Sequence, residues 1–257
     1  MLPSLFVAHG APTLAIEKHA YVDFLKTLAT SLPRPKAIVI FSAHWESDVQ
    51  LVSDVAEYGT IYDFYGFPDE LYRMTYPAKG DASLAREIVG LFQAQGIKAE
   101  LDTKRGLDHG AWVPLELLYP EVDIPVVALS VSPTLSAKEQ YQIGKALAPL
   151  REKDVLVIGS GGTVHNLRRL NWGSSSVEDW AKQFDEWLAD GFAKWDTEEL
   201  FEYETKAPYA REAVPTPEHF IPILLAMGAA DDQRVAKRLH QSYQLGSLSL
   251  ASWQFGE

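Results

Sequence analysis

The chain has 257 residues, of which 47% are hydrophobic and 23% are charged, and this length and composition predict one globular domain spanning residues 1–257. No apolar run approaches the roughly 20 residues that a membrane-spanning helix needs, and a net charge of −12 with scattered basic residues argues against a nucleic-acid partner. Because the chain contains no cysteine, disulfides, thiolate metal ligands and a cysteine nucleophile are excluded, and any metal must be held by nitrogen and oxygen.

Short apolar and β-branched runs alternate with helical patterns along most of the chain. The N-terminal residues lack the basic region of a secretory signal, so we expect a cytoplasmic protein. The apolar runs predict buried strands at residues 4–9, 36–44, 124–131 and 154–161. Apolar residues at spacings of three and four predict helices at 21–32, 82–95, 137–150 and 177–188. The alternation predicts an α/β fold: a single domain with a mostly parallel central sheet flanked by helices.

The last third of the chain contains less regular segments. Residues 172–176 are expected to form a loop, and residues 207–217 to be irregular because they are punctuated by proline. A late helix is expected to open with Thr216 as its cap and Pro217 in its first turn, which would put His219 in that turn. Its apolar continuation predicts a buried helix that Pro222 could kink. Residues 247–255 alternate well enough to form a final strand.

His9 and His44 lie at the carboxyl ends of two predicted strands. Ligands of open α/β sheets bind in the crevice outside those strand ends. The contexts VAHGAP and FSAHWES leave room for a metal and a substrate, and Gly10 lets the backbone turn sharply. Imidazole is a common ligand for iron and zinc, and a catalytic site needs about three protein ligands. Either histidine alone could be a hydrogen-bonded core residue, but two in equivalent positions favour a metal site.

His165 follows a glycine-rich turn in the segment GSGGTVHN, again near the carboxyl end of a predicted strand. The segment lacks the lysine and spacing of a phosphate-binding loop and does not match the dinucleotide fingerprint. We interpret the glycines as allowing close approach of the backbone to a ligand, with His165 as an acid or base because imidazole titrates near neutral pH. A purely structural histidine is the alternative.

Two further histidines have less decided roles. His109, beside Asp108, could contact substrate or support the metal ligands, or it could be a turn histidine bonded to the backbone. His219 follows Glu218, and either could be the third ligand, giving a three-histidine site or a site with two histidines and one carboxylate. We favour His219, since a helix dipole already explains a glutamate near a helix N-terminus. Trp45, together with Tyr62 and Tyr65 of the aromatic segment YDFYGFP, could form an aromatic lid over the site.

Five segments together resemble the class III extradiol aromatic ring-opening dioxygenases, and most closely the 4,5-DOPA dioxygenase extradiol subgroup. The resemblance runs almost end to end and rests on FVAHGAPTLA, FSAHWES, LDHGAWVPL, GSGGTVHNLRRL and TPEHFIPILLAMGAA. It implies a metal bound by His9, His44 and His219, with His165 as acid–base catalyst and His109 nearby. It also implies Fe²⁺ for activity, and a catechol and O₂ as substrates whose reaction opens the ring to a semialdehyde acid.

The chain differs from many members of this class because His219 stands where they use glutamate as the third ligand. Three histidines also suit Zn²⁺, so two alternatives accompany the dioxygenase hypothesis. One is a zinc-dependent hydrolase in which His165 acts as the base. The other is a non-catalytic metal-containing binding protein on the same scaffold. The physiological substrate depends on loops near residues 57–68 and 203–216, whose conformation the sequence does not predict.

Overall fold

The central strands of the sheet are parallel and buried, except near the carboxyl end of β2, where His44 is partly exposed and Glu46 is exposed. The computed structural model describes residues 1–171 and 176–257, and the loop predicted at 172–176 lies outside them except for its last residue. Within these residues one sheet has eight strands in the order β4-β3-β5-β2-β6-β1-β10-β7. Its parallel centre consists of β5 (Val126–Val131), β2 (Ala37–Glu46), β6 (Val155–Gly161) and β1 (Ser4–Ala8). These are the four predicted strands, and the mostly parallel sheet is confirmed.

Antiparallel pairs extend the sheet on both sides. On one side β3 (Gln50–Ser53) pairs antiparallel to β5 and parallel to β4 (Ala99–Asp102). On the other side β10 (Ser252–Phe255) pairs antiparallel to both β1 and β7 (Ala236–His240). A separate two-stranded ribbon joins β8 (Tyr243–Gln244) to β9 (Leu248–Ser249). The final strand predicted at 247–255 is therefore divided between β9 and β10.

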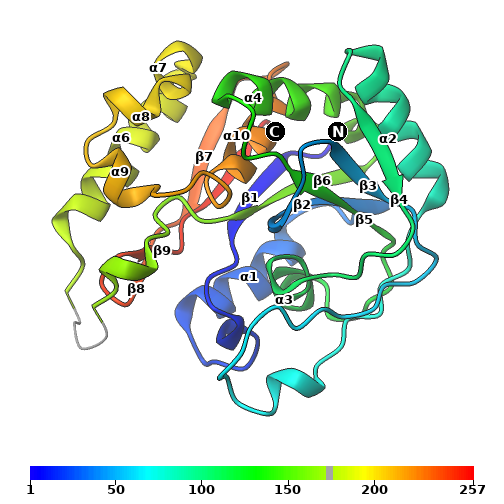
Figure 1. The fold of residues 1–257 in the computed structure, drawn as a ribbon, viewed down its shortest axis with the longest axis horizontal. Coiled ribbons are helices and arrows are strands. Elements are labelled where there is room, and N and C mark those ends of the chain that lie inside the picture. Colours follow the sequence, from blue (N-terminus) through cyan, green and yellow to red (C-terminus); the bar gives the residue numbers. More distant parts are fainter. Residues whose placement is uncertain (172–175) are drawn as a thin grey trace.

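Helices cover both faces of the sheet (Figure 1). On one face α1 (Ala20–Ser31) and α3 (His109–Leu118) pack on alternate residues of the strands, such as Ile38 and Ile40. On the other face α2 (Ala82–Ala94), α4 (Ala137–Ala146), α5 (Ala148–Arg151) and α10 (Ile221–Gly228) pack on the intervening residues, such as Val39 and Phe41. This period of two along each strand is what a sheet buried on both faces requires.

The remaining helices form a third group around the antiparallel end of the sheet. They are α6 (Asp179–Lys194), α7 (Thr197–Phe201), α8 (Tyr203–Lys206) and α9 (Ala210–Ala213). Short 3-10 turns occur at η1 (Pro12–Ala15), η2 (Leu71–Arg73) and η3 (Leu167–Arg169). No helix in the described part of the chain is both long and apolar enough to cross a membrane.

Several details of the helix prediction were wrong. The helix expected at 137–150 is divided into α4 and α5, and α3 was not predicted as a helix. The late helix begins at Ile221 rather than after Thr216, so His219 lies in the turn before the helix. Pro222 therefore lies in the first turn, where its missing N–H costs no hydrogen bond and causes no kink. The Thr216 hydroxyl donates to Glu218 instead of capping the helix (2.9 Å).

Candidate metal centre and active site

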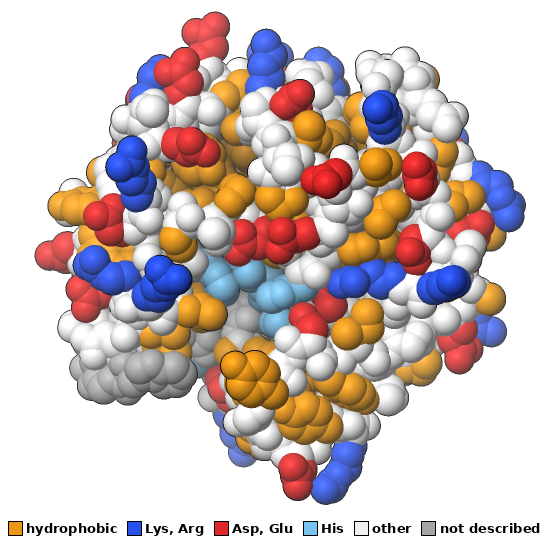
Figure 2. Space-filling model, viewed as in Figure 1, with side chains coloured by type: hydrophobic (Ala, Val, Ile, Leu, Met, Phe, Trp, Pro, Cys, Tyr) orange, Lys and Arg blue, Asp and Glu red, His pale blue; other side chains and the backbone are white. Residues whose placement is uncertain are grey.

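Five histidines from five separate segments meet at the carboxyl edge of the parallel strands. His9 directly follows β1, His44 lies near the end of β2, His109 is the first residue of α3, His165 follows β6, and His219 precedes α10. Figure 2 shows histidine side chains gathered in a recess of the molecular surface, with acidic side chains at its rim. The sequence prediction of a site at these strand ends is consistent with this arrangement. His19 and His240 lie elsewhere: His19 caps α1, and His240 packs on Phe24.

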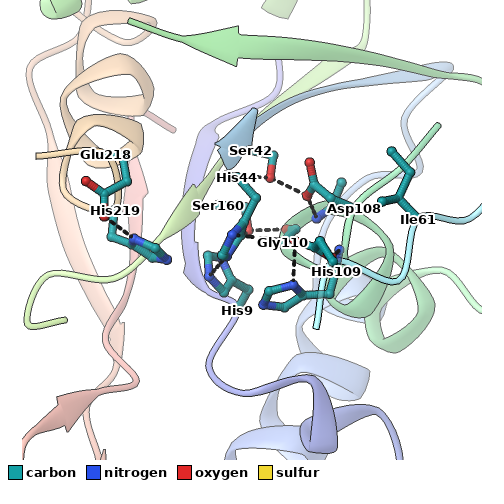
Figure 3. Close-up of polar contacts among 12 residues, drawn as sticks. His9, Ser42, His44, Ile61, Asp108, His109, Gly110, Ser160, Glu218 and His219 are labelled. Atoms are coloured by element: carbon teal, nitrogen blue, oxygen red, sulfur yellow. Dashed lines mark hydrogen bonds and ion pairs between the residues drawn. The ribbon is translucent and has the colours of Figure 1, made fainter. Parts of the chain in front are cut away.

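The two histidines at the ends of β1 and β2 face each other through their Nε2 atoms, which are 3.1 Å apart. Two nitrogens each about 2.1 Å from one metal ion and roughly at right angles would have this separation. The His219 ring centroid lies 5.2 Å from that of His9 and 4.8 Å from that of His44. In Figure 3 the His219 imidazole points from the α10 side toward these two rings. Such a nitrogen set can hold Fe²⁺ or Zn²⁺.

Hydrogen bonds on the outer side of the rings determine which nitrogen faces the centre. The Ser160 hydroxyl donates to the Gly110 carbonyl, so its oxygen accepts from His9 Nδ1 (3.1 Å) and leaves His9 Nε2 unprotonated. His219 Nδ1 donates to Glu218 Oε1 (3.0 Å), and the buried His219 Nε2 has no hydrogen-bond partner in the described part of the chain. Metal-binding histidines commonly have an acceptor of this kind behind the ring.

Glu218 therefore occupies a different position from the one it would have as a ligand. Its Oε1 accepts from both Thr216 and His219 Nδ1, so the carboxylate lies behind the His219 ring. The helix-dipole explanation given for Glu218 is replaced by this pair of contacts, since the residue precedes the helix. The arrangement favours His219 over Glu218 as the group that faces the centre.

His109 and His165 flank the centre in different ways. Ligand atoms of His9, His44 and His109 lie within 4.8 Å of one another, and so do those of His165, Glu218 and His219. The rings of His165 and His219 are stacked, with centroids 3.5 Å apart and planes within 6° of parallel. The nitrogen lone pairs of two parallel, stacked rings cannot converge on one ion, so His165 and His219 cannot both bind the same ion in this arrangement.

Asp63 is a residue of the site that the sequence analysis missed. Its Oδ2 accepts from His109 Nδ1 (2.9 Å) and lies 3.5 Å from His44 Nδ1, while its Oδ1 accepts from the His109 backbone N–H (3.0 Å). Asp63 belongs to the loop between β3 and η2, 46 residues before His109. No sequence pattern connects it to the histidines. Its only signal was membership of the aromatic segment considered as a lid.

Burial lowers the pKa values of three of the imidazoles, whereas contacts with histidine lower the pKa values of the two carboxylates. Burial, reinforced by neighbouring imidazoles, lowers the pKa of His9 well below 6.5, that of His44 to about 2 and that of His165 to about 3. Burial alone would raise the pKa of Asp63, but the hydrogen bonds and charge of His109 lower it to about 2. His219 lowers the pKa of Glu218 to about 2 in the same way against its burial. Neutral nitrogens thus face inward and two anions lie behind them.

Glycines let the site-bearing segments pack closely. The glycines of GSGGTVHN were expected to approach a ligand, but they approach the chain itself. A Cβ at Gly161 would lie 2.1 Å from the His219 carbonyl oxygen, and one at Gly159 would lie 2.0 Å from the Pro222 carbonyl oxygen. Only glycine there allows the segment of His219 to lie against β6. Gly10 has a φ of +58°, as expected for a sharp turn after His9.

Asp108 fastens the start of α3 to the end of β2. It caps α3 at the Ala111 backbone N–H (3.2 Å), accepts from Ser42 (2.5 Å), and forms an ion pair with Arg105 (2.9 Å). The Arg105 guanidinium also donates to the His44 carbonyl (3.0 Å). These contacts hold His109 beside His44, whose ring centroids are 4.1 Å apart.

The fold and this centre define an α/β enzyme whose clustered imidazoles could hold a metal ion at the carboxyl edge of a parallel sheet. A family model described as the catalytic LigB subunit of aromatic ring-opening dioxygenase matches residues 3–252. The chain therefore belongs to this family of aromatic ring-opening dioxygenases, and the resemblance drawn from the five sequence segments is confirmed.

Individual relatives are similar over nearly their whole length. A 4,5-DOPA dioxygenase extradiol from Beta vulgaris is 44% identical over 256 residues, covering 98% of this chain and 96% of that protein. A protein of the same name from Escherichia coli K12 is 37% identical over 259 residues, covering 99% and 95%. The crystal structure of an uncharacterized protein from Escherichia coli K12 superposes with a TM-score of 0.84 at 33% identity and covers 100% of both chains.

Proposed function

We propose that this protein is an iron(II)-dependent extradiol dioxygenase that uses O₂ to open the ring of a DOPA-like catechol. The observation that carries the proposal is the 3.1 Å separation of His9 Nε2 and His44 Nε2, with the Nδ1 of His9 bonded outward. The names of the relatives from Beta vulgaris and Escherichia coli support a DOPA-like substrate. We take residues 1–257 as one catalytic domain, because the site draws its histidines from residues 9 to 219 around one sheet.

His9, His44 and His219 are the proposed metal ligands. His219 is preferred as the third because its buried Nε2 lacks a partner, which a ligand bond would supply. The His109 ring lies closer to the His44 ring (centroids 4.1 Å apart) than the His219 ring does (4.8 Å), but we assign His109 to the substrate, as the family resemblance implies. When bound, Fe²⁺ would bring the catechol oxygens and O₂ together and lower the pKa of the catechol hydroxyls. Zn²⁺ suits the same three nitrogens and is the ion that the isolated protein could also carry.

His165 is the proposed acid–base catalyst. Burial lowers the pKa of His165 to about 3 and keeps its imidazole neutral at physiological pH, so it could accept a proton from a catechol hydroxyl made more acidic by bound Fe²⁺ and return it as the ring opens. Stacking on His219 keeps its ring beside the proposed ligands. His109, with Nδ1 bonded to Asp63, has Nε2 free to accept a hydrogen bond from the substrate.

Oxygen uptake by the iron-reconstituted protein across a small panel of catechols tests the proposal. We expect O₂ consumption and a yellow product, and a fall in rate of about 100- to 10,000-fold in His165→Ala. Zinc-loaded protein serves as the metal control and should consume no oxygen. Absence of uptake with every catechol, under conditions where iron is bound, would overturn the proposal. The cytoplasmic location stays a prediction that cell fractionation can check.

A further inference from the structure

We propose that Asp63 is a positioning residue of this centre, and that its single carboxylate orients both His44 and His109. The inference rests on the proposed function only in taking His44 as a metal ligand. Asp63 would not touch the substrate or the metal, since its oxygens face imidazole Nδ1 atoms and a backbone N–H.

Asp63 accepts two hydrogen bonds from His109. One carboxylate oxygen accepts from the His109 backbone N–H at 3.0 Å and the other accepts from His109 Nδ1 at 2.9 Å. Two contacts with one residue fix the plane of the carboxylate as well as its position. The second oxygen then lies 3.5 Å from His44 Nδ1. One anion therefore lies on the outer side of both rings.

The loop that carries Asp63 is tied to the start of α3. The Ile61 backbone N–H donates to the Leu107 carbonyl (2.7 Å), and the Leu107 N–H donates to the Gly59 carbonyl (2.9 Å). Trp112, on α3, donates its indole N–H to the Ile61 carbonyl (3.3 Å). These bonds place Asp63 beside the first residue of α3 by backbone pairing, so the contact with His109 does not depend on one flexible side chain.

Asp63 completes a pattern in which each proposed ligand has an oxygen atom behind its ring, although the 3.5 Å between His44 Nδ1 and Asp63 Oδ2 is an ion-pair distance and longer than a hydrogen bond. Ser160 has this role for His9 and Glu218 has it for His219, which leaves His44 with Asp63. With Nδ1 directed toward the carboxylate, His44 presents Nε2 to His9 Nε2. Because an imidazole must be unprotonated at the nitrogen that binds a metal, three imidazole ligands would leave the two charges of a divalent ion uncompensated. Asp63 and Glu218 supply two negative charges, each on the outer side of the imidazole of a proposed metal ligand.

Metal titration of Asp63 variants tests the inference separately from catalysis. We expect Asp63→Ala to weaken the binding of Zn²⁺, measured by competition with a chromophoric chelator, by about 10- to 100-fold. We expect Asp63→Asn to lose less, because its amide oxygen can still accept from the His109 N–H. The visible absorption of Co²⁺-loaded protein should change in both variants, since the orientation of His44 at the ion changes.

Asp54→Asn is the matched control. Asp54 is a half-buried carboxylate with 15% of its side chain exposed, against 22% for Asp63, and it forms a long ion pair with Arg86 away from the histidines. The Asp54→Asn substitution should leave both the Zn²⁺ affinity and the Co²⁺ spectrum unchanged. Zn²⁺ affinities of Asp63→Ala and Asp63→Asn within twofold of the parent protein would overturn the inference. Asp63-dependent metal binding without oxygen uptake would instead overturn the proposed function alone.

Discussion

Two aspartates, the buried Asp185 and Asp63, whose side chain is 22% exposed, show how one type of side chain can serve different purposes in this fold. Asp63 contacts two imidazoles, whereas Asp185, on α6, accepts from three hydroxyl groups and one amide group: Thr163 (2.6 Å), Tyr243 (2.7 Å), Ser249 (2.7 Å) and Gln241 (2.9 Å). Burial raises the pKa of Asp185 despite these four hydrogen bonds, while that of Asp63 is lowered. Asp185, which accepts hydrogen bonds from hydroxyl and amide groups of several segments, joins those segments. A carboxylate behind imidazoles orients groups that bind or react.

Asp185 is nevertheless connected to the site through the backbone. Thr163 lies two residues before His165, and Val164 between them accepts at its carbonyl from the Ser249 N–H (3.2 Å). Asp185 thus links α6, the loop after β6 and the ribbon of β8 and β9. We therefore expect substitution of Asp185 to lower mainly the free energy of unfolding, and substitution of Asp63 to lower mainly the affinity for metal.

The largest expected effect is on stability in Asp185→Ala. The substitution leaves four donors without their acceptor in a place where Asp185 is only 2% exposed. We expect a loss of about 3–5 kcal/mol in the free energy of unfolding, measured by urea denaturation of the metal-free protein. Asp190→Ala, at an exposed position of the same helix, should change it by less than about 0.5 kcal/mol. A loss below about 1 kcal/mol for Asp185→Ala would remove the distinction between the two aspartates.

Gly161→Ala probes the contact between the two regions, because Gly161 lies between the loop held by Asp185 and the turn of His219. The added methyl group would meet the His219 carbonyl oxygen at 2.1 Å, so one segment must move. We expect a loss of about 2–3 kcal/mol in stability together with weaker Zn²⁺ binding. Gly90→Ala is the control: no atom lies within 4 Å of its added Cβ, and it should stabilise α2 by about 0.5–1 kcal/mol. Unaltered Zn²⁺ affinity in Gly161→Ala would show that His219 tolerates the shift.

The sequence predicts the centre of this fold better than its margins. The four parallel strands were placed within two residues at each end, because continuous apolar runs are characteristic of strands buried on both faces. Strands β3, β4 and β7 were missed, since they are short and β4 and β7 are partly exposed. Their pairing is decided by neighbours distant in sequence. Helix α3 was missed because it is buried on nearly all sides and contains Pro114, so it has no amphipathic period.

The site likewise has a part that the sequence predicts and a part that it does not. The histidines at strand ends could be predicted because topology alone brings those ends together. Asp63 could not, since its contact with His109 depends on backbone pairing of a loop that has no regular pattern of its own. The role of Glu218 was also beyond prediction. Whether Glu218 faces the centre of the site or the outer side of the His219 ring depends on where α10 begins, which the sequence does not fix to the residue.

The two aspartates should respond to pH with opposite signs in metal-free protein. The pKa of Asp63 falls from 3.8 to about 2 on folding, so its stabilisation is present above pH 3.8 and is lost as the pH falls toward 2. The pKa of Asp185 is raised, so its ionised form stabilises the fold less than its protonated form does, and its contribution decreases as the pH rises through the raised pKa.

Urea denaturation of the parent protein, Asp63→Asn and Asp185→Asn over pH 2.5–7 measures both effects. The stability difference between parent and Asp63→Asn should grow with pH over the acid range, by on the order of 2 kcal/mol. The difference between parent and Asp185→Asn should shrink as the pH rises. Two differences that change in the same direction would contradict the contrast drawn from their partners.

The smallest expected effect on stability is at Tyr65, two residues beyond Asp63. Its side chain is 92% exposed, so Tyr65→Ala should change the free energy of unfolding by less than about 0.5 kcal/mol. By contrast Tyr62 donates to the Met74 carbonyl (2.8 Å), and Phe64 packs edge-on against His109, so these neighbours already have partners. An exposed ring beside a residue that orients the site is available to cover an aromatic substrate. We expect Tyr65→Ala to raise the KM for a catechol by about 2- to 10-fold, the value of one aromatic pair, with Zn²⁺ affinity unchanged. An unchanged KM would exclude Tyr65 from a lid and confine the function of this loop to Asp63.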